Sequence, residues 1–281
     1  MTGDDAADAG LFAGFADWPV SEPRTDVGAV DLEALMRVLA RVEADGHRRG
    51  WDGTPMTLFC VYAHDDEYTH GVLRKLCGAN PRMLAGARVG PYTAQPVFPG
   101  HLLGSAGGQQ PYEALRTFAI NIAYCAPHVP AFAGVNVIRH VLRLPGVVAV
   151  GVTYEALRRP LTTREQVDDE LAGTAPDYRT VPDAVELRVV MACDLAGRIH
   201  QVTRTRGDRP VTVGGYRMLV PGESRVEESP DVESFGDQSN SLRILADMIV
   251  GRNPDTTEGF AARYPSYTAG MRSAMTGGAA G

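Results

Sequence analysis

The sequence has no long apolar run, because nowhere do about 18 or more apolar residues follow one another, which is the length that a membrane-spanning helix requires. Nor does it begin with a basic segment followed by an apolar one, as a secretory signal does, because its N-terminus is acidic. These two absences predict a cytoplasmic protein that has no membrane partner.

An excess of basic residues is also missing, since the formal net charge is -7 and the pI is about 5.5. Sequence-independent binding to nucleic acid depends on clustered Lys and Arg side chains. Arg204, Arg206 and Arg209 lie close together, but Asp208 stands among them, and a solvated strand end accounts for the group. The sequence therefore predicts no nucleic-acid partner.

Cysteines are few, and no two of Cys60, Cys77, Cys125 and Cys193 have the C-x-x-C spacing of metal-binding or redox motifs. Three of the four stand in apolar surroundings, which favours buried, reduced thiols over disulfides in the cytoplasm. His128 lies close enough to Cys125 to suggest a base beside a nucleophile. Because no separate orienting acid is visible, a buried thiol is the favoured interpretation of Cys125.

Motifs for nucleotide binding are absent too. The glycines before Pro111 have neither the Lys-Ser/Thr ending of a phosphate-binding loop nor the spacing of a dinucleotide-binding turn. These glycines are Gly100, Gly104, Gly107 and Gly108. The sequence accordingly predicts no nucleotide fold and no cofactor.

The clearest element that is present is a β-hairpin between Asp183 and Arg206. In residues 185–193 apolar side chains first alternate with polar ones and then occupy both faces, which is typical of a strand that becomes buried along its length. A turn follows, and then a second strand. Because Ile199 and Val202 are three residues apart, strict alternation fails, and we expect either a bulge near His200 or an exposed, twisted outer strand.

The rest of the pattern predicts a mixture of helices and strands. Helices are expected from Asp31 to about Gly46, from Asp65 or Asp66 to Leu76, from Pro111 to Tyr124, from Val135 to Leu142, from Thr162 or Thr163 to Leu171, and from Leu242 to Ile249. Buried strands are expected at Thr57 to Ala63 and at Val147 to Tyr154. Without a regular β-α-β alternation, these elements predict an α+β fold: a largely antiparallel sheet of three to five strands with helices packed on one face.

We expect a single domain at residues 28–250, flanked by flexible ends. Residues 1–27 are rich in Ala, Asp and Gly and predict a flexible N-terminal arm. Residues 251–281 lose the apolar period and end in Gly and Ala, which predicts a flexible C-terminal tail.

Residues 78–111 form a Gly/Pro-rich stretch without a sustained period, and it is longer than most connections inside a domain. One interpretation is a functional loop, in which the large side chains Tyr92, Phe98 and His101 contact a ligand or a partner. The other is a tolerated surface insertion, since the cost of closing a loop grows slowly with its length.

The densest group of potential metal ligands is His64, Asp65 and Asp66, with His70 six residues after His64. Imidazole and carboxylate groups at the end of a strand can hold a divalent metal ion. The same residues also suit helix capping by Asp with an acidic residue in the first turn. If the helix begins at Asp66, His70 lies about one turn inside it, and the spacing alone does not bring the two histidines together.

Four pieces of the chain resemble a family of small uncharacterised actinobacterial α+β proteins. They are Gly50-Trp51-Asp52 with Pro55 and Leu58-Phe59, then Leu144 to Pro160, then Asp183 to Arg206, then the closing helix. The resemblance implies an α+β domain whose hairpin carries spaced arginines, here Arg198, Arg204 and Arg206. It implies no activity and assigns no role to any residue.

Two functions follow from these observations. The first is a non-catalytic binding or regulatory module for an unknown protein or small molecule, since no set of nucleophile, base and orienting group stands out. The second is a metal-dependent enzyme whose site lies between His64 and the stretch at 78–111.

Overall fold

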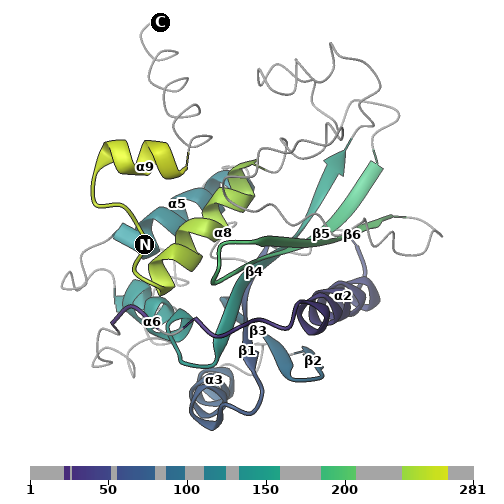
Figure 1. The fold of residues 1–281 in the computed structure, drawn as a ribbon. Helices are drawn as coiled ribbons and strands as arrows, with labels where there is room; N and C mark the ends of the chain where they lie inside the picture. The colour runs from purple at the N-terminus through teal and green to yellow at the C-terminus, as the bar shows by residue number, and fades with distance from the viewer. Residues whose placement is uncertain are drawn as a thin grey trace, which may run out of the picture.

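The computed structural model of the protein describes residues 22–25, 27–51, 56–79, 87–98, 111–124, 133–158, 185–206 and 236–264 (Figure 1). Within these ranges no helix combines the length and the apolar character that crossing a bilayer takes. The predicted helix at 162–171 and the outer ends of the chain, 1–21 and 265–281, lie outside this description.

Six strands form one sheet, in which every neighbouring pair is antiparallel. In order across the sheet they are β2 (Ala87–Val89), β3 (Tyr92–Phe98), β1 (Thr57–Ala63), β4 (Val147–Arg158), β5 (Val185–Asp194) and β6 (Ile199–Thr205). The predicted α+β class and antiparallel sheet are confirmed, but the sheet has six strands rather than three to five. The additional strands are β2 and β3, which form a hairpin inside the stretch that we expected to lack structure.

Pro96 concealed β3 in the sequence, because proline is uncommon inside a sheet. The structure accommodates it in two ways. The short strand β2 pairs only with residues 92–94, so no hydrogen bond is required of Pro96 on that side. On the other side, the register with β1 shifts between Leu58 and Phe59, beside the proline.

The helices begin where the sequence supplies caps. They are α2 (Leu32–Arg49), α3 (Glu67–Ala79), α5 (Pro111–Tyr124), α6 (Ala133–Leu142), α8 (Gly236–Ile249) and α9 (Thr257–Arg263). The Asp31 side chain accepts a hydrogen bond from the backbone N–H of Ala34 at 3.0 Å, which fixes the start of α2. The Asp66 side chain does the same for α3, accepting from the N–H of Thr69 at 2.7 Å.

Helices cover both faces of the sheet, not one as predicted (Figure 1). Leu187, Val189 and Met191 of β5 belong to a core with α5, α6 and α8, whereas Val190 and Ala192 belong to a second core with α2. Successive residues of a strand point to opposite faces, so these two cores lie on opposite sides. An amphipathic helix indicates that it has a buried face, but not which face of a sheet it covers.

The register of the β5–β6 hairpin runs without a shift from Leu187 opposite Thr205 to Cys193 opposite Ile199. The predicted bulge near His200 is therefore not formed, and β6 is instead the outer strand of the described sheet. Ile199 packs in the core of α5, α6 and α8, whereas Val202 packs in the core of α2. Their spacing of three residues thus reflects burial on two faces.

Parts of the two segments that were predicted as flexible ends are described by the structure, namely residues 22–25 and 251–264. The backbone N–H of Arg24 donates to the carbonyl of Ile249 at 2.8 Å. Beyond residue 251 the chain forms α9, and Tyr264 is fully buried with its hydroxyl donating to Asp247 at 2.8 Å. The long-range partners of these residues are not visible in a local sequence pattern.

Candidate functional site

The candidate site lies at the corner where β1 ends and α3 begins. His64, Asp65 and Asp66 form this corner, and the Asp66 Oδ1 atom caps α3 through Thr69. The hydroxyl oxygen of Thr69 in turn accepts from the N–H of Gly146, 3.0 Å away, at the start of β4. The helix-capping interpretation of Asp66 is therefore realised, and the cap also ties the corner to the neighbouring strand.

The structure brings His64 and His70 together. Their ring centroids are 5.4 Å apart, with the ring planes at 65°. His64 Nδ1 lies 3.2 Å from the Thr93 hydroxyl, and His70 Nδ1 lies 3.1 Å from the Tyr62 hydroxyl. Each imidazole is therefore oriented by a hydroxyl group from the sheet, which sequence spacing did not reveal.

Burial and charged neighbours of both signs affect the titration of His64. Desolvation in its half-buried position lowers the pKa of the His64 imidazole, and the nearby Arg88 and His70 lower it further, while Asp65 acts in the opposite sense. A lowered pKa means that the neutral imidazole is favoured at pH 7.

The predicted metal ligands come from this corner, but they do not form a complete set. Among the residues that the structure describes, no three His, Cys, Asp or Glu side chains are grouped so as to hold a metal ion. One oxygen of Asp66 is occupied by the helix cap. A metal site at His64, Asp65, Asp66 and His70 therefore stays a prediction.

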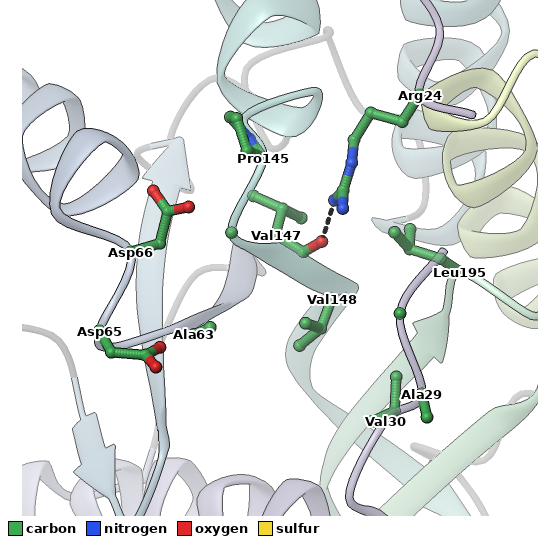
Figure 2. Close-up of a pocket in the computed structure, with 12 residues that line it drawn as sticks. Arg24, Ala29, Val30, Ala63, Asp65, Asp66, Pro145, Val147, Val148 and Leu195 are labelled. Carbon is green, nitrogen blue, oxygen red and sulfur yellow. Dashed lines mark hydrogen bonds between the residues drawn. The ribbon is translucent and has the colours of Figure 1, made fainter. Parts of the chain in front are cut away.

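A cavity of about 350 Å³ opens on the other side of the same corner (Figure 2). Asp65 and Asp66 form one wall, and Arg24 stands across from them. The space between is lined mainly by small and apolar residues: Gly28, Ala29, Val30, Ala63, Pro145, Gly146, Val147, Val148 and Leu195. The cavity thus joins an acidic wall to an apolar floor.

The charged side chains of the two walls differ in their hydrogen bonds. The Arg24 guanidinium donates to the carbonyl of Val147 and, at 3.4 Å, to that of Leu144, so it holds the N-terminal segment against β4 (Figure 2). The Asp65 carboxylate is exposed and makes no hydrogen bond or ion pair to any described residue. Asp65 is therefore the charged group that is available to a ligand.

Gly146 permits the acidic wall to lie close to β4. A Cβ atom at this position would lie 2.7 Å from the Cβ of Asp66 and 3.0 Å from the Thr69 hydroxyl. Any larger residue would push the corner away from the strand, which makes this glycine a requirement for the shape of the cavity.

The predicted contact residues of the 78–111 stretch have different positions. Tyr92 is only 6% exposed, packs in the core of α2, and accepts a hydrogen bond from the N–H of Asp31 at 3.0 Å. Its position supports the α2 core and leaves little of the ring for a ligand. The side chain of Phe98 and all of His101 lie outside the described residues.

The described thiols are unsuited to nucleophilic chemistry. Cys60 and Cys193 are buried. Burial, and then the charge of Asp194, raise the pKa of the Cys193 thiol far above its ordinary value, so it stays protonated. Cys125 and His128 lie outside the described residues, as does the side chain of Cys77.

The sequence pointed to Asp65 and Asp66 of the cavity as potential ligands, but it did not point to the residues that face them. Arg24, Ala29 and Val30 come from a segment whose composition indicated flexibility or gave no pattern, and only their tertiary contacts give them a role. Comparisons with protein-family models, with curated proteins and with solved structures found no match to this chain.

Proposed function

We propose that the protein is a non-catalytic binding module, and that its ligand is a small organic amine held in the cavity at the β1–α3 corner. The observation that carries this proposal is the exposed, unpaired Asp65 carboxylate beside an apolar floor. A volume of about 350 Å³ is within the range of small-molecule sites. The ammonium group of the ligand would pair with Asp65, and its alkyl part would lie against Val147 and Val148.

The absence of activated nucleophiles among the described residues supports binding rather than catalysis. The Cys193 thiol is protonated and buried, and Asp66 is engaged as a helix cap. A cavity with one free charge and apolar walls is suited to selecting a ligand by charge and shape.

Thermal denaturation in the presence of n-butylamine, with n-butanol as its uncharged counterpart, tests the proposal. The amine is expected to raise the melting temperature in a saturable way, and the alcohol is not. Asp65→Asn should abolish the effect of the amine. If the two compounds act alike, or if Asp65→Asn responds as the wild type does, the cavity is not an amine site.

A second pair of variants separates occupation of the cavity from general effects on the fold. Gly28 lines the cavity, and a Cβ atom there meets nothing within 4 Å, so Gly28→Leu should fold and obstruct the cavity. Gly71 in α3 also has open space around a Cβ but does not line the cavity. Gly71→Leu should therefore keep the response to the amine that Gly28→Leu loses.

A further inference from the structure

A second group of polar side chains lies at the same corner but outside the cavity. In the sheet, Arg88 stands opposite Thr93, and Thr93 stands opposite Tyr62. Directly opposed residues on antiparallel strands point to the same face. Tyr62 belongs to the core of α5, α6 and α8, whereas the cavity residue Ala63 packs against the core of α2. The row from Arg88 to Tyr62 is therefore on the face opposite to that of Ala63.

His64 and His70 complete this group, which we define as the Arg88–His64–His70 cluster. His64 is bonded to Thr93 and His70 to Tyr62, and the two rings are in contact at 5.4 Å. Arg88 is exposed and close enough to influence the titration of His64. None of the three lines the cavity.

The permanent positive charge of the cluster is that of Arg88. Arg88 has no ion pair with any described residue. The acid that acts on His64 is Asp65, which is exposed and faces the cavity. A guanidinium without an ion pair thus lies near two half-exposed imidazoles.

The hydroxyl partners determine whether the Nε2 atom of each imidazole donates a hydrogen bond to a ligand or carries a lone pair. If Thr93 and Tyr62 donate to the two Nδ1 atoms, both Nε2 atoms carry a proton and act as donors. If the Nδ1 atoms donate instead, both Nε2 atoms carry lone pairs and suit a metal ion. The unpaired guanidinium of Arg88 near His64 attracts an anion and repels a metal cation, so an anion is the favoured ligand. An anion accepts hydrogen bonds, and it therefore requires the first arrangement.

We propose that the Arg88–His64–His70 cluster binds a small oxyanion of the phosphate or sulfate type. The planar guanidinium of Arg88 supplies paired donors, and the two fixed imidazoles supply one Nε2–H donor each. This site is separate from the proposed amine cavity, and neither proposal depends on the other.

Sulfate is the probe for the test, because it keeps the same charge over the pH range in which histidine titrates. Histidine side-chain ¹H–¹⁵N spectra of the full chain would be followed while sulfate replaces chloride at constant ionic strength. The signals of His64 and His70, assigned with His64→Gln and His70→Gln, should shift in a saturable way. The ¹⁵N shifts of the free protein should also show protonated Nε2 atoms in both rings.

Two arginine variants give the matched comparison. Arg88→Ala removes the central cation of the cluster and should weaken sulfate binding by about tenfold, because a charge-assisted hydrogen bond is lost. Arg37 is also exposed but lies on α2, which covers the opposite face of the sheet, so Arg37→Ala should change the affinity by less than about twofold. Both substitutions are at exposed positions and should leave the melting temperature near that of the wild type.

The pH dependence adds an independent check. Sulfate binding should weaken as the pH rises from about 5.5 to about 8, because histidines lose their positive charge in this range. His64 is faced by Arg88, His70 and Asp65, so bound sulfate should also raise the pKa of His64 by offsetting the two cations. Equal weakening in Arg88→Ala and Arg37→Ala, shifts that follow ionic strength alone, or Nε2 lone pairs that bind zinc instead of sulfate would each overturn the proposal.

Discussion

The two faces of the sheet are covered by different chemistry. Between the sheet and α5, α6 and α8 the buried contacts are apolar, and the buried charges of Arg139 and Asp247 are met by groups on neighbouring helices. Between the sheet and α2, ion pairs are inserted among the apolar contacts. The Arg204 Nε atom lies 2.6 Å from Glu43, which is fully buried, and Arg188 Nη2 lies 2.5 Å from Glu155.

This difference indicates that ion pairs to the sheet help to position α2, in addition to its apolar contacts. Arg188 is 1% exposed, and its guanidinium lies 4.5 Å from the centroid of the Trp51 ring. Its Nε and Nη1 atoms have no hydrogen-bond partner among the described residues. A Cβ atom on Gly46 would lie 3.2 Å from the Arg188 side chain, so the glycine lets α2 approach it. Buried ion pairs contribute little net stability, but they oppose any other placement of the helix.

The largest expected effect comes from adding an unpaired charge to the α2 face. Val190 in β5 is fully buried, and Val190→Asp should unfold the protein, because an unpaired charge there costs several kcal/mol against a total stability of about 5–15 kcal/mol. Circular dichroism would measure the loss of structure. Gln201→Asp, on the half-exposed outer strand, is the control and should remain folded. A soluble Val190→Asp variant with an unchanged melting temperature would contradict the described burial.

Removing one partner of a buried ion pair is the next test of the comparison. Glu43→Ala leaves Arg204 without its carboxylate and should lower the free energy of unfolding by about 3–5 kcal/mol in urea denaturation. Replacing both residues by leucine should recover most of that loss, because apolar residues can replace a buried pair. If the double variant is less stable than Glu43→Ala, the ion pair contributes net stability in addition to positioning α2.

Asp194, at the end of β5, provides a pH-dependent test on the same side. Burial would raise the pKa of this carboxyl, but hydrogen bonds from His200 and Arg198 outweigh it and lower the pKa below its ordinary value. The ionised carboxylate therefore stabilises the fold above about pH 4, and this stabilisation is lost as the pH falls through the folded-state pKa.

Asp194→Asn should accordingly reduce the free energy of unfolding at pH 7 by about 2 kcal/mol, the value of a hydrogen bond to a charged group. Urea denaturation at several pH values should show that the difference from the wild type shrinks under acid conditions. A difference that is constant with pH would mean that the charge of Asp194 is not responsible.

The smallest effect is expected on the apolar face. The Tyr154 hydroxyl is buried and has no hydrogen-bond partner among the described residues. Tyr154→Phe removes this polar group and should leave stability unchanged or raise it by about 1 kcal/mol, as thermal denaturation would show. A clear loss of stability would reveal a partner for the hydroxyl.

Features governed by local sequence could be predicted, and those governed by tertiary contacts could not. The bounds of β1, the caps at Asp31 and Asp66, and the β5–β6 hairpin follow from apolar period and turn chemistry within a few residues. The hairpin of β2 and β3 was missed because β2 has three residues and β3 contains Pro96. Tyr264 was placed in a tail, since its burial depends on Asp247 in α8.

The same distinction between local sequence and tertiary contacts applies to the residues of the candidate site. His64, Asp65, Asp66 and His70 were recognisable because they are close in the sequence. Their neighbours Thr93, Arg88 and Arg24 come from distant segments, and no local period points to them. Pairing of strands decides which side chains share a face, so the missed hairpin concealed the position of Arg88 and Thr93 near the two histidines.

The hydrogen bond between Arg24 and Ile249 joins the first described segment to the end of α8. During synthesis the segment around Arg24 emerges long before Ile249 exists, so this hydrogen bond cannot form until almost the whole domain has been made. Contacts of such large sequence separation slow folding, because a long loop must close before they form. A nascent chain that ends before α8 would therefore hold the cavity wall at Arg24 only through the bonds from its guanidinium to Val147 and Leu144.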